Sequence, residues 1–249
     1  MSELRQDGVQ AAGCPSADLQ GRSVVVCVKW GLLYGSEYVH RLYDGLRRNT
    51  TLPFRFICFT DDPSGLRDDI EHRPLLNPDV IGWWHKSWLF SDECGLTDQV
   101  VYMDLDTVIT GNVDEMLAWR GEFIIAANPA SRSRNPKAGN IGAMLMGWRG
   151  GMDYGRDTWG RVLRGGPSLY GNQAHTGDQR LMGLHPPDGG FRFWQDECPG
   201  ARIVSYKADI RANGNALPDD VAVVCFHGTP RPHEVADLPW MQEHWREDA

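Results

Sequence analysis

The sequence lacks the features of several classes of protein. It has no excess of basic residues, and its net charge of −8 argues against a nucleic-acid partner. No apolar run approaches the roughly 20 residues that a transmembrane helix requires, so we expect no transmembrane segment. Residues 1–21 have neither the basic start nor the apolar middle of a signal peptide, and we expect a flexible N-terminal tail there.

The cysteines show no zinc-binding pattern. None of the six belongs to a C-x-x-C pair. Cys27, Cys58 and Cys225 fall inside strand-like apolar runs, where a free thiol behaves as a small hydrophobic group. Free cysteines are typical of a reducing compartment, so the sequence predicts a cytoplasmic protein.

The remaining composition is that of an ordinary globular domain, with 41% hydrophobic and 23% charged residues over 249 positions. We find no internal repeat and no linker, and we expect one domain over residues 22–232 with a C-terminal tail over 233–249. Apolar runs at 23–28 and 54–59 predict two strands. A helical pattern that begins at Ser36, the expected N-cap, separates them. Strand, helix and strand form a βαβ unit, which predicts an α/β fold with a mostly parallel central sheet.

An unbroken apolar run over residues 100–103 ends on two carboxylates, Asp104 and Asp106. The run predicts a strand that is buried on both faces. If the strand continues through both acids, their side chains leave one face with Cα atoms roughly 7 Å apart, and a divalent ion fits between them. Ligands of open α/β sheets bind at the carboxyl ends of strands. The structural alternative is that Asp106 opens a turn with Thr107 while Asp104 makes one buried salt bridge.

Two other charged residues lie near the ends of expected elements. Lys86 belongs to an expected helix over residues 81–90, in which we assign Trp84 and Trp88 to the core. It precedes the acidic strand and can reach an aspartate or a phosphate. Asp61 follows the second strand, where it either binds a nucleotide base or ribose or only shapes a turn.

Two segments further along the chain allow a functional and a plain structural interpretation. Residues 176–182 predict the start of a helix with Asp178 and Gln179 in its first turn, where an acid is electrostatically favoured even without a catalytic role. Residues 131–139 form a polar, basic loop that is either a lid over an anionic donor or an ordinary surface loop.

His227 follows an expected strand over residues 221–226. A lone histidine in such a place is more often structural than a ligand. Gly228 comes next, however, and a glycine lets the backbone approach a bound molecule closely. Two carboxylates and one imidazole suit Mn²⁺ or Mg²⁺, which acts as a Lewis acid on a leaving diphosphate.

In their order along the chain, these motifs resemble the glycosyltransferases of the GT-A fold. They are most similar to the retaining family 8 enzymes, the glycogenin and bacterial galactosyltransferase group. The resemblance runs from about Val24 to Pro232 and rests on residues 56–61, 101–107, 111–113, 140–142, 177–179 and 226–228. It implies a single Rossmann-like GT-A domain, a nucleotide-sugar donor with a UDP-sugar as the first choice, a divalent cation, and a carbohydrate or glycoconjugate acceptor glycosylated with retention.

The resemblance also implies roles for the matching residues. Asp104, Asp106 and His227 would hold the metal, and Asp178 and Gln179 would be the catalytic residues near the reacting carbon. The donor would be bound by Val28, Tyr34, Asp61, Lys86, Asp104, Leu105, Asn140, Gly142, Gly228 and Arg231.

The chain departs from the family pattern after His227. The family places its glycine three residues beyond the histidine and a lysine further on, whereas here Gly228 is adjacent and no lysine follows. Arg231 is then the only nearby cation for the diphosphate.

Two other functions fit part of the pattern. Residues 104–108 also match the haloacid-dehalogenase phosphatases, in which the first aspartate, here Asp104, is phosphorylated. That motif normally lies on the first strand of its domain, whereas here a βαβ unit precedes it. A non-catalytic module that binds a sugar nucleotide would keep the same pocket without turnover.

Overall fold

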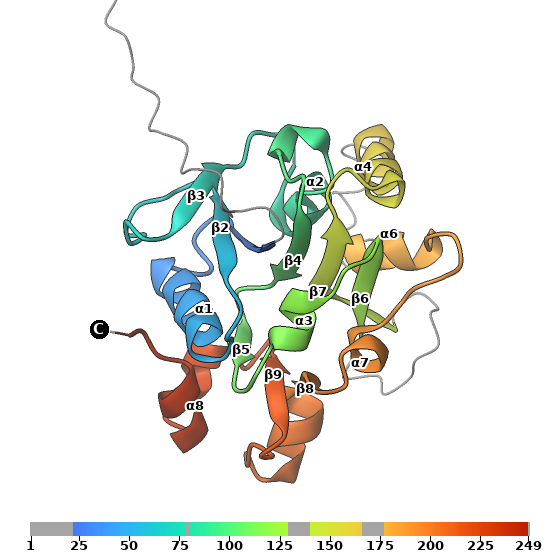
Figure 1. Ribbon diagram of the computed structural model, residues 1–249. Coiled ribbons are helices and arrows are strands. Elements are labelled where there is room, and N and C mark those ends of the chain that lie inside the picture. The colour runs from blue at the N-terminus through green and yellow to red at the C-terminus, as the bar shows by residue number, and fades with distance from the viewer. Residues whose placement is uncertain (1–21, 78–79, 129–139, 166–176, 249) are drawn as a thin grey trace, which may run out of the picture.

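The computed structural model describes residues 22–77, 80–128, 140–165 and 177–248. Its centre is a six-stranded sheet in the order β3-β2-β1-β4-β7-β6, beside a three-stranded sheet in the order β5-β9-β8 (Figure 1). The strands are β1 (Ser23–Lys29), β2 (Phe54–Thr60), β3 (Glu71–Pro74), β4 (Gln99–Met103), β5 (Thr107–Ile109), β6 (Phe123–Ala127), β7 (Ile141–Arg149), β8 (Arg202–Ser205) and β9 (Val221–Cys225).

The helices lie between and after these strands. The α-helices are α1 (Ser36–Arg48), α2 (His85–Trp88), α3 (Asp114–Ala118), α4 (Asp153–Gly165), α6 (Asp178–Leu184), α7 (Trp194–Glu197) and α8 (Pro239–His244). Tighter turns are η1 (Gly82–Trp84), η2 (Asp92–Cys94), η4 (Arg211–Asn213) and η5 (Pro232–Val235), and η3 (Tyr206–Ile210) is a single π-helical turn. No helix of the described segments is long and apolar enough to cross a membrane.

The central sheet is mostly parallel, as the βαβ pattern predicts. β1 pairs in parallel with β2 and with β4, and β3 continues this direction beyond β2. β7 is antiparallel to both β4 and β6, so it alone runs against the other five. The α/β class and the sheet type expected from the sequence are therefore confirmed.

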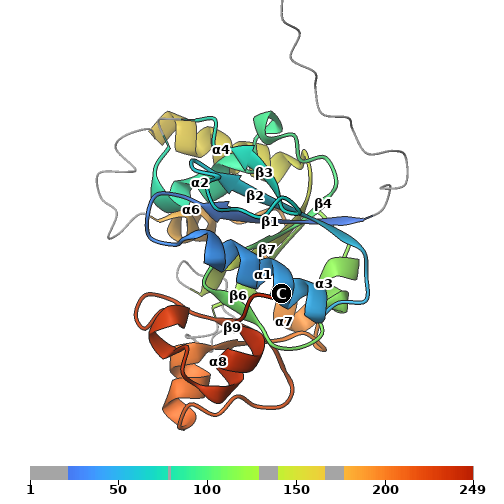
Figure 2. The same cartoon turned by 90° about the vertical axis from the view of Figure 1, so that its left-hand side faces the viewer.

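The sheet is covered on both faces, which explains why β1 and β4 are apolar without alternation. Val25 and Val101 face a core that they share with Leu42 of α1, whereas Val24 and Val100 face a second core. The second core contains side chains of η1, α2, α4 and α6, namely Trp84, Trp88, Trp159 and Met182. Figure 2 shows α1 on one side of the strands and α2 and α4 on the other.

The order of the strands fixes the place of a ligand. From β1 the chain builds outward to β2 and β3, and then returns to add β4 on the other side of β1. The connections leave β1 and β4 in opposite directions, which opens a crevice at the carboxyl ends of these two strands. Asp104 follows β4 directly and therefore lies at this crevice.

Three local predictions are wrong. Gly35, not Ser36, is the N-cap of α1. Residues 81–90 form η1 and one turn of α2 instead of one continuous helix. The strand also stops at Met103: the N–H of Thr107 donates to the carbonyl of Asp104 at 3.1 Å, so a turn carries the two aspartates.

The segment after residue 232 belongs to the packed fold, at least to residue 248. Trp240 and Trp245 are buried, and the ring of Trp245 packs edge-on against Tyr38 of α1. Arg48, at the end of α1, forms an ion pair of 2.7 Å with Asp248. The prediction of a C-terminal tail is thus wrong for residues 233–248, because α8 covers apolar surface of α1 (Figures 1 and 2).

Two predictions concern residues outside the described segments, namely the tail over 1–21 and the basic loop over 131–139. In the described part of the chain all cysteines are free and buried, including the three expected in strands: Cys27, Cys58, Cys94, Cys198 and Cys225.

Candidate active site

The turn after β4 presents two carboxylates with different partners. Tyr102, the last residue but one of β4, donates a hydrogen bond to Asp104. Tyr34, from the loop before α1, donates a hydrogen bond of 2.9 Å to Asp106. In a strand, the side chains of Asp104 and Asp106 would leave the same face. In this turn they point in different directions, and each carboxylate therefore bonds a different tyrosine.

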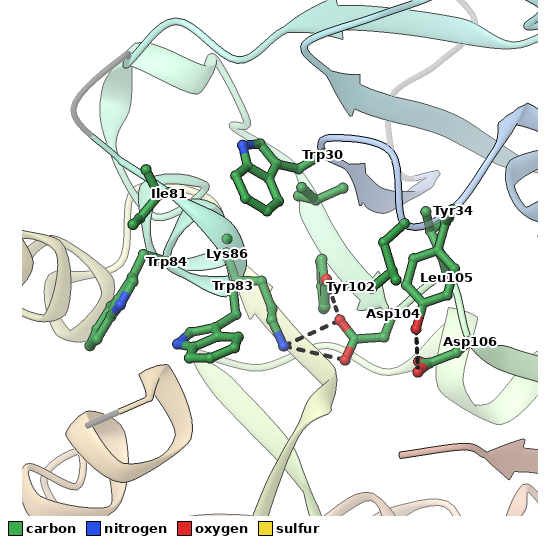
Figure 3. A pocket seen from close by; sticks show the side chains of 13 residues that line it. Trp30, Tyr34, Ile81, Trp83, Trp84, Lys86, Tyr102, Asp104, Leu105 and Asp106 are labelled. Atoms are coloured by element: carbon green, nitrogen blue, oxygen red, sulfur yellow. Dashed lines mark hydrogen bonds and ion pairs between the residues drawn. The ribbon is translucent and has the colours of Figure 1, made fainter. Parts of the chain in front are cut away.

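Lys86 joins the acidic turn to a distant helix. Its ammonium lies 3.2 Å from Asp104 and 3.3 Å from Asp178, the first residue of α6. Figure 3 shows the lysine reaching across the floor of the cavity to Asp104. Burial lowers the pKa of Lys86, but the two carboxylates outweigh this effect and raise it above its ordinary value. The buried lysine therefore stays charged.

Burial and mutual repulsion disfavour the ionised form of two carboxyl groups at the site. Burial and the charge of Asp104 raise the pKa of Asp106 to about 7, although the Tyr34 hydroxyl and Lys86 oppose this rise. Burial also raises the pKa of Asp178 against the influence of Lys86. A cation beside these groups would be stabilised by the same charge that makes their ionisation costly.

A cavity of about 360 Å³ opens over this turn. Six of the residues predicted for the site line it: Val28, Tyr34, Lys86, Asp104, Leu105 and Asp106. The rest of the wall is apolar or aromatic and comes from the loops after β1 and before α2, and from β4: Trp30, Leu33, Ile81, Gly82, Trp83, Trp84 and Tyr102. The structure thus assembles the acidic turn, the lysine and the first strand into one cavity (Figure 3).

Sequence reasoning missed the aromatic wall. Trp84 and Trp88 are buried as expected, but Trp83, directly before Trp84, is 41% exposed and faces the cavity. Trp30 is 42% exposed and lies near the ring of His85. A helical pattern cannot identify these residues, because Trp83 lies in a 3₁₀ turn and Trp30 in a loop.

Five predicted donor residues do not line the described cavity: Asp61, Asn140 and Gly142, and also Gly228 and Arg231, which follow β9. Asp61 accepts hydrogen bonds of 3.0 and 3.2 Å from the backbone N–H of Gly31, so it holds the loop that carries Trp30. Asn140 directly precedes β7, and its carbonyl accepts from the N–H of Asn128. Gly142 lies in β7, where a Cβ would overlap the sulfur of Met144.

The predicted catalytic pair is placed at the start of α6. Asp178 is 6% exposed and contacts Lys86, which brings it to the site. Gln179 is only half-buried and does not line the described cavity.

The chain after β9 meets the acidic turn, where the N–H of Phe226 donates to the carbonyl of Asp106 at 3.2 Å, but the residues that follow do not line the described cavity. The imidazole Nε2 of His227 lies 2.8 Å from the hydroxyl of Ser205. Burial lowers the pKa of His227, and the nearby Lys207 and Arg211 lower it further. Gly228 has a φ of +67°, in the left-handed region, and the Nζ of Lys207 lies 3.4 Å from the point that a Cβ would occupy.

His227 has a second cation nearby, in addition to the expected Arg231. Arg231 is close enough to Tyr34 for its charge to lower the pKa of that phenol, against burial and Asp106, which raise it. Lys207 is a second cation beside Gly228 and precedes the histidine in the sequence. The prediction that Arg231 is the only nearby cation is therefore wrong.

The donor set fits a hard divalent cation in part. Asp104 and Asp106 offer carboxylate oxygens, which are the ligands that Mg²⁺ and Mn²⁺ prefer, although Asp104 already pairs with Lys86. The lowered pKa of His227 favours the neutral ring that binds metals, but the same ring bonds Ser205 and lies near two cations. Within the described segments, no three His, Cys, Asp or Glu side chains form a group that could hold a metal.

Comparisons with known proteins show the fold. No protein-family model and no curated protein matches the chain. The galactosyltransferase LgtC, solved with donor and acceptor sugar analogs, is 13% identical, with a TM-score of 0.56 over 84% of this chain and 88% of that one. The apo glycosyltransferase GlyE of Streptococcus pneumoniae TIGR4 is 11% identical, with a TM-score of 0.58 over 91% of this chain and 65% of that one. An active-site mutant of LgtC has a TM-score of 0.55 at 12% identity, over 88% of this chain and 93% of that one. The chain therefore has the GT-A fold that its motifs predict.

Proposed function

We propose that the chain is a glycosyltransferase that moves a sugar from a nucleotide-sugar donor, a UDP-sugar as the first choice, to a carbohydrate or glycoconjugate acceptor. One observation carries the proposal: Asp104 and Asp106 line a cavity at the crevice between the ends of β1 and β4. The similarity in fold to LgtC and GlyE supports it.

The aromatic and the charged residues of the cavity suit different parts of such a donor: its base or sugar ring, and its diphosphate. Trp30 and Trp83 offer exposed aromatic surface, on which a base or the apolar face of a sugar ring can pack. The same cavity is also lined by Lys86 and the two acids of the turn. A cavity with an apolar wall and a few convergent polar groups is typical of small-molecule sites.

A divalent cation, Mn²⁺ or Mg²⁺, is part of the proposal. Asp104 and Asp106 would hold it, whereas the expected third ligand, His227, bonds Ser205 and forms no group of three with them. When bound, it would act as a Lewis acid on the donor diphosphate. The chain's own part is to orient the ligands: Tyr102 and Lys86 fix Asp104, and Tyr34 fixes Asp106.

Asp178 and Gln179 are the proposed catalytic residues. When the bond from the anomeric carbon to the phosphate oxygen breaks, the electron pair stays on that oxygen and positive charge grows on the sugar. A fixed carboxylate nearby stabilises this charge, and Lys86 holds Asp178 in place. In a retaining reaction the acceptor oxygen bonds the same face of the sugar, and its proton passes to the leaving phosphate oxygen.

The phosphatase alternative gains no support from the geometry of Asp104. Both carboxylate oxygens of Asp104 contact Lys86, and Tyr102 donates to one of them, so the structure holds this carboxylate as a member of a charged cluster. The aspartate also follows β4 and not the first strand of the domain.

A thermal-shift screen of UDP-, GDP- and CMP-sugars with and without Mn²⁺, followed by an assay of nucleoside diphosphate release, tests the proposal. We expect one donor to raise the melting temperature in the presence of Mn²⁺ and to be consumed, slowly with water alone as the acceptor. A beryllofluoride adduct on Asp104 would instead identify a phosphatase. A shift without turnover of any donor would favour the binding module.

A further inference from the structure

Two cations flank Gly228 without an acidic partner. Lys207, on η3, places its ammonium 3.4 Å from the position of a Cβ on this glycine. Arg231 lies three residues further along the chain, and its charge lowers the pKa of Tyr34 against burial and Asp106, which raise it. In the described part of the chain, neither side chain forms an ion pair with a carboxylate. Both charges are therefore available to an anion that approaches the backbone of Gly228.

The position of Lys207 is fixed by a buried serine. The backbone N–H of Ser205 donates to Asp209 at 2.9 Å, and its hydroxyl accepts from the N–H of Ala208 at 3.2 Å. The same hydroxyl bonds His227 at 2.8 Å. One side chain thus holds both the turn that carries Lys207 and the histidine before Gly228, and the lysine is presented by a rigid support.

The charges of the site require such cations. Asp104, Asp106 and Asp178 would face the diphosphate of a donor with the proposed divalent cation and, among the described side chains that contact them, Lys86 to balance their charge, and Lys86 already contacts two of the three. A diphosphate in this field would be repelled unless further positive charge were supplied. Lys207 lies next to Gly228, which has no side chain, and the charge of Arg231 reaches Tyr34, which lines the cavity.

We propose that Lys207 and Arg231 together bind the diphosphate of the nucleotide donor over Gly228, and that Lys207 substitutes for the lysine that the sequence lacks after His227. This inference rests on the proposed function, because it concerns the same donor. The ammonium of a lysine acts on a phosphate oxygen as a point charge, and the guanidinium of an arginine donates to phosphate oxygens as a planar fork. The pair therefore suits two linked phosphates.

Calorimetry with a series of nucleotides tests the proposal. The probes are UDP, GDP, ADP and CDP with Mn²⁺, then the monophosphate and the nucleoside of whichever diphosphate binds the wild type. We expect Lys207→Met to weaken the diphosphate at least tenfold, the monophosphate less, and the nucleoside within twofold. Lys207→Arg should restore most of the diphosphate affinity. The matched control is Arg211→Met, which removes another cation near His227 but one that is exposed, and it should stay within twofold.

The outcomes separate the two proposals. If the wild type binds a diphosphate and Lys207→Met binds it within twofold, the inference on Lys207 is wrong and the proposed function stands. Equal loss in Lys207→Met and Lys207→Arg, with an unchanged melting temperature, would also overturn it, because a charge role predicts rescue by arginine. If the wild type binds none of the four diphosphates and none of the nucleotide sugars, both proposals fail together.

Discussion

The ammonium of Lys86 lies 3.3 Å from a carboxylate oxygen of Asp178, although the two residues are far apart in the sequence. Both side chains are buried, and Lys86 is held at the same time by Asp104. This contact places the start of α6 against the acidic turn after β4. It makes Asp178 part of the site and not only the first residue of a short helix.

Asp178→Asn should lower kcat by about 10²–10³ and change the donor KM much less, because the lost charge acts mainly on the transition state. Gln179→Ala, at a half-buried position, should have a smaller effect. Steady-state kinetics and the melting temperature are measured on the same variants. A destabilised Asp178→Asn enzyme with normal turnover would show that the residue serves only the helix and the lysine.

Asp106→Ala should abolish the part of nucleoside diphosphate binding that depends on Mn²⁺, since Asp106 is one of the proposed metal ligands. Calorimetry with and without Mn²⁺ measures this directly. Asp157→Ala, at an exposed position of α4, is the control for loss of an aspartate and should bind as the wild type does. Unchanged metal-dependent affinity in a folded Asp106→Ala protein would remove this residue from the metal site.

Trp83→Ala should weaken donor or acceptor binding several-fold while changing the free energy of unfolding by only about 0.5 kcal/mol, because the side chain is 41% exposed on the cavity wall. Leu163→Ala removes an exposed apolar side chain (54%) from α4, outside the described cavity wall, and should leave binding unchanged. Calorimetry and denaturant unfolding on both variants check the prediction. If Trp83→Ala binds the ligand as well as Leu163→Ala does, Trp83 has no part in binding.

Asp44 predicts a dependence of stability on acid pH. Its buried carboxylate accepts hydrogen bonds of 2.7 and 2.8 Å from Arg67 and one of 2.9 Å from the N–H of Asp248. Burial raises the pKa of Asp44, but these contacts outweigh it and the net shift is downward. The stabilisation is therefore complete above the unfolded-state pKa of about 3.9 and is lost as the pH falls below it through the lower folded-state pKa.

Asp44→Asn should accordingly cost roughly 2 kcal/mol at neutral pH, and progressively less as the pH falls below about 4. Urea unfolding of the wild type and the variant between pH 7 and pH 3 gives the difference. Asp69→Asn, which changes a more exposed partner of the same arginine, serves as the control and should show a much smaller difference. A constant difference across this range would contradict the role of the carboxylate charge.

The sequence alone was sufficient for the framework of the site. An apolar run that is buried on both faces can only be a central strand, and the acids that end it must lie at its carboxyl edge. The same reasoning placed Lys86 within reach of an aspartate, and the structure shows it at Asp104. Periodicity and burial are local properties of the chain, so they can be recognised without knowledge of the fold.

The tertiary structure decided which side chains meet. The turn at Asp104 depends on the chain leaving the central sheet to pair β5 with β9, and the exposure of Trp83 depends on a 3₁₀ turn in place of a helix. Lys207 reaches Gly228 because β8 and β9 pair in parallel and end side by side. Such contacts join residues that are distant in the sequence, and their energies come from packing and pairing that no local pattern records.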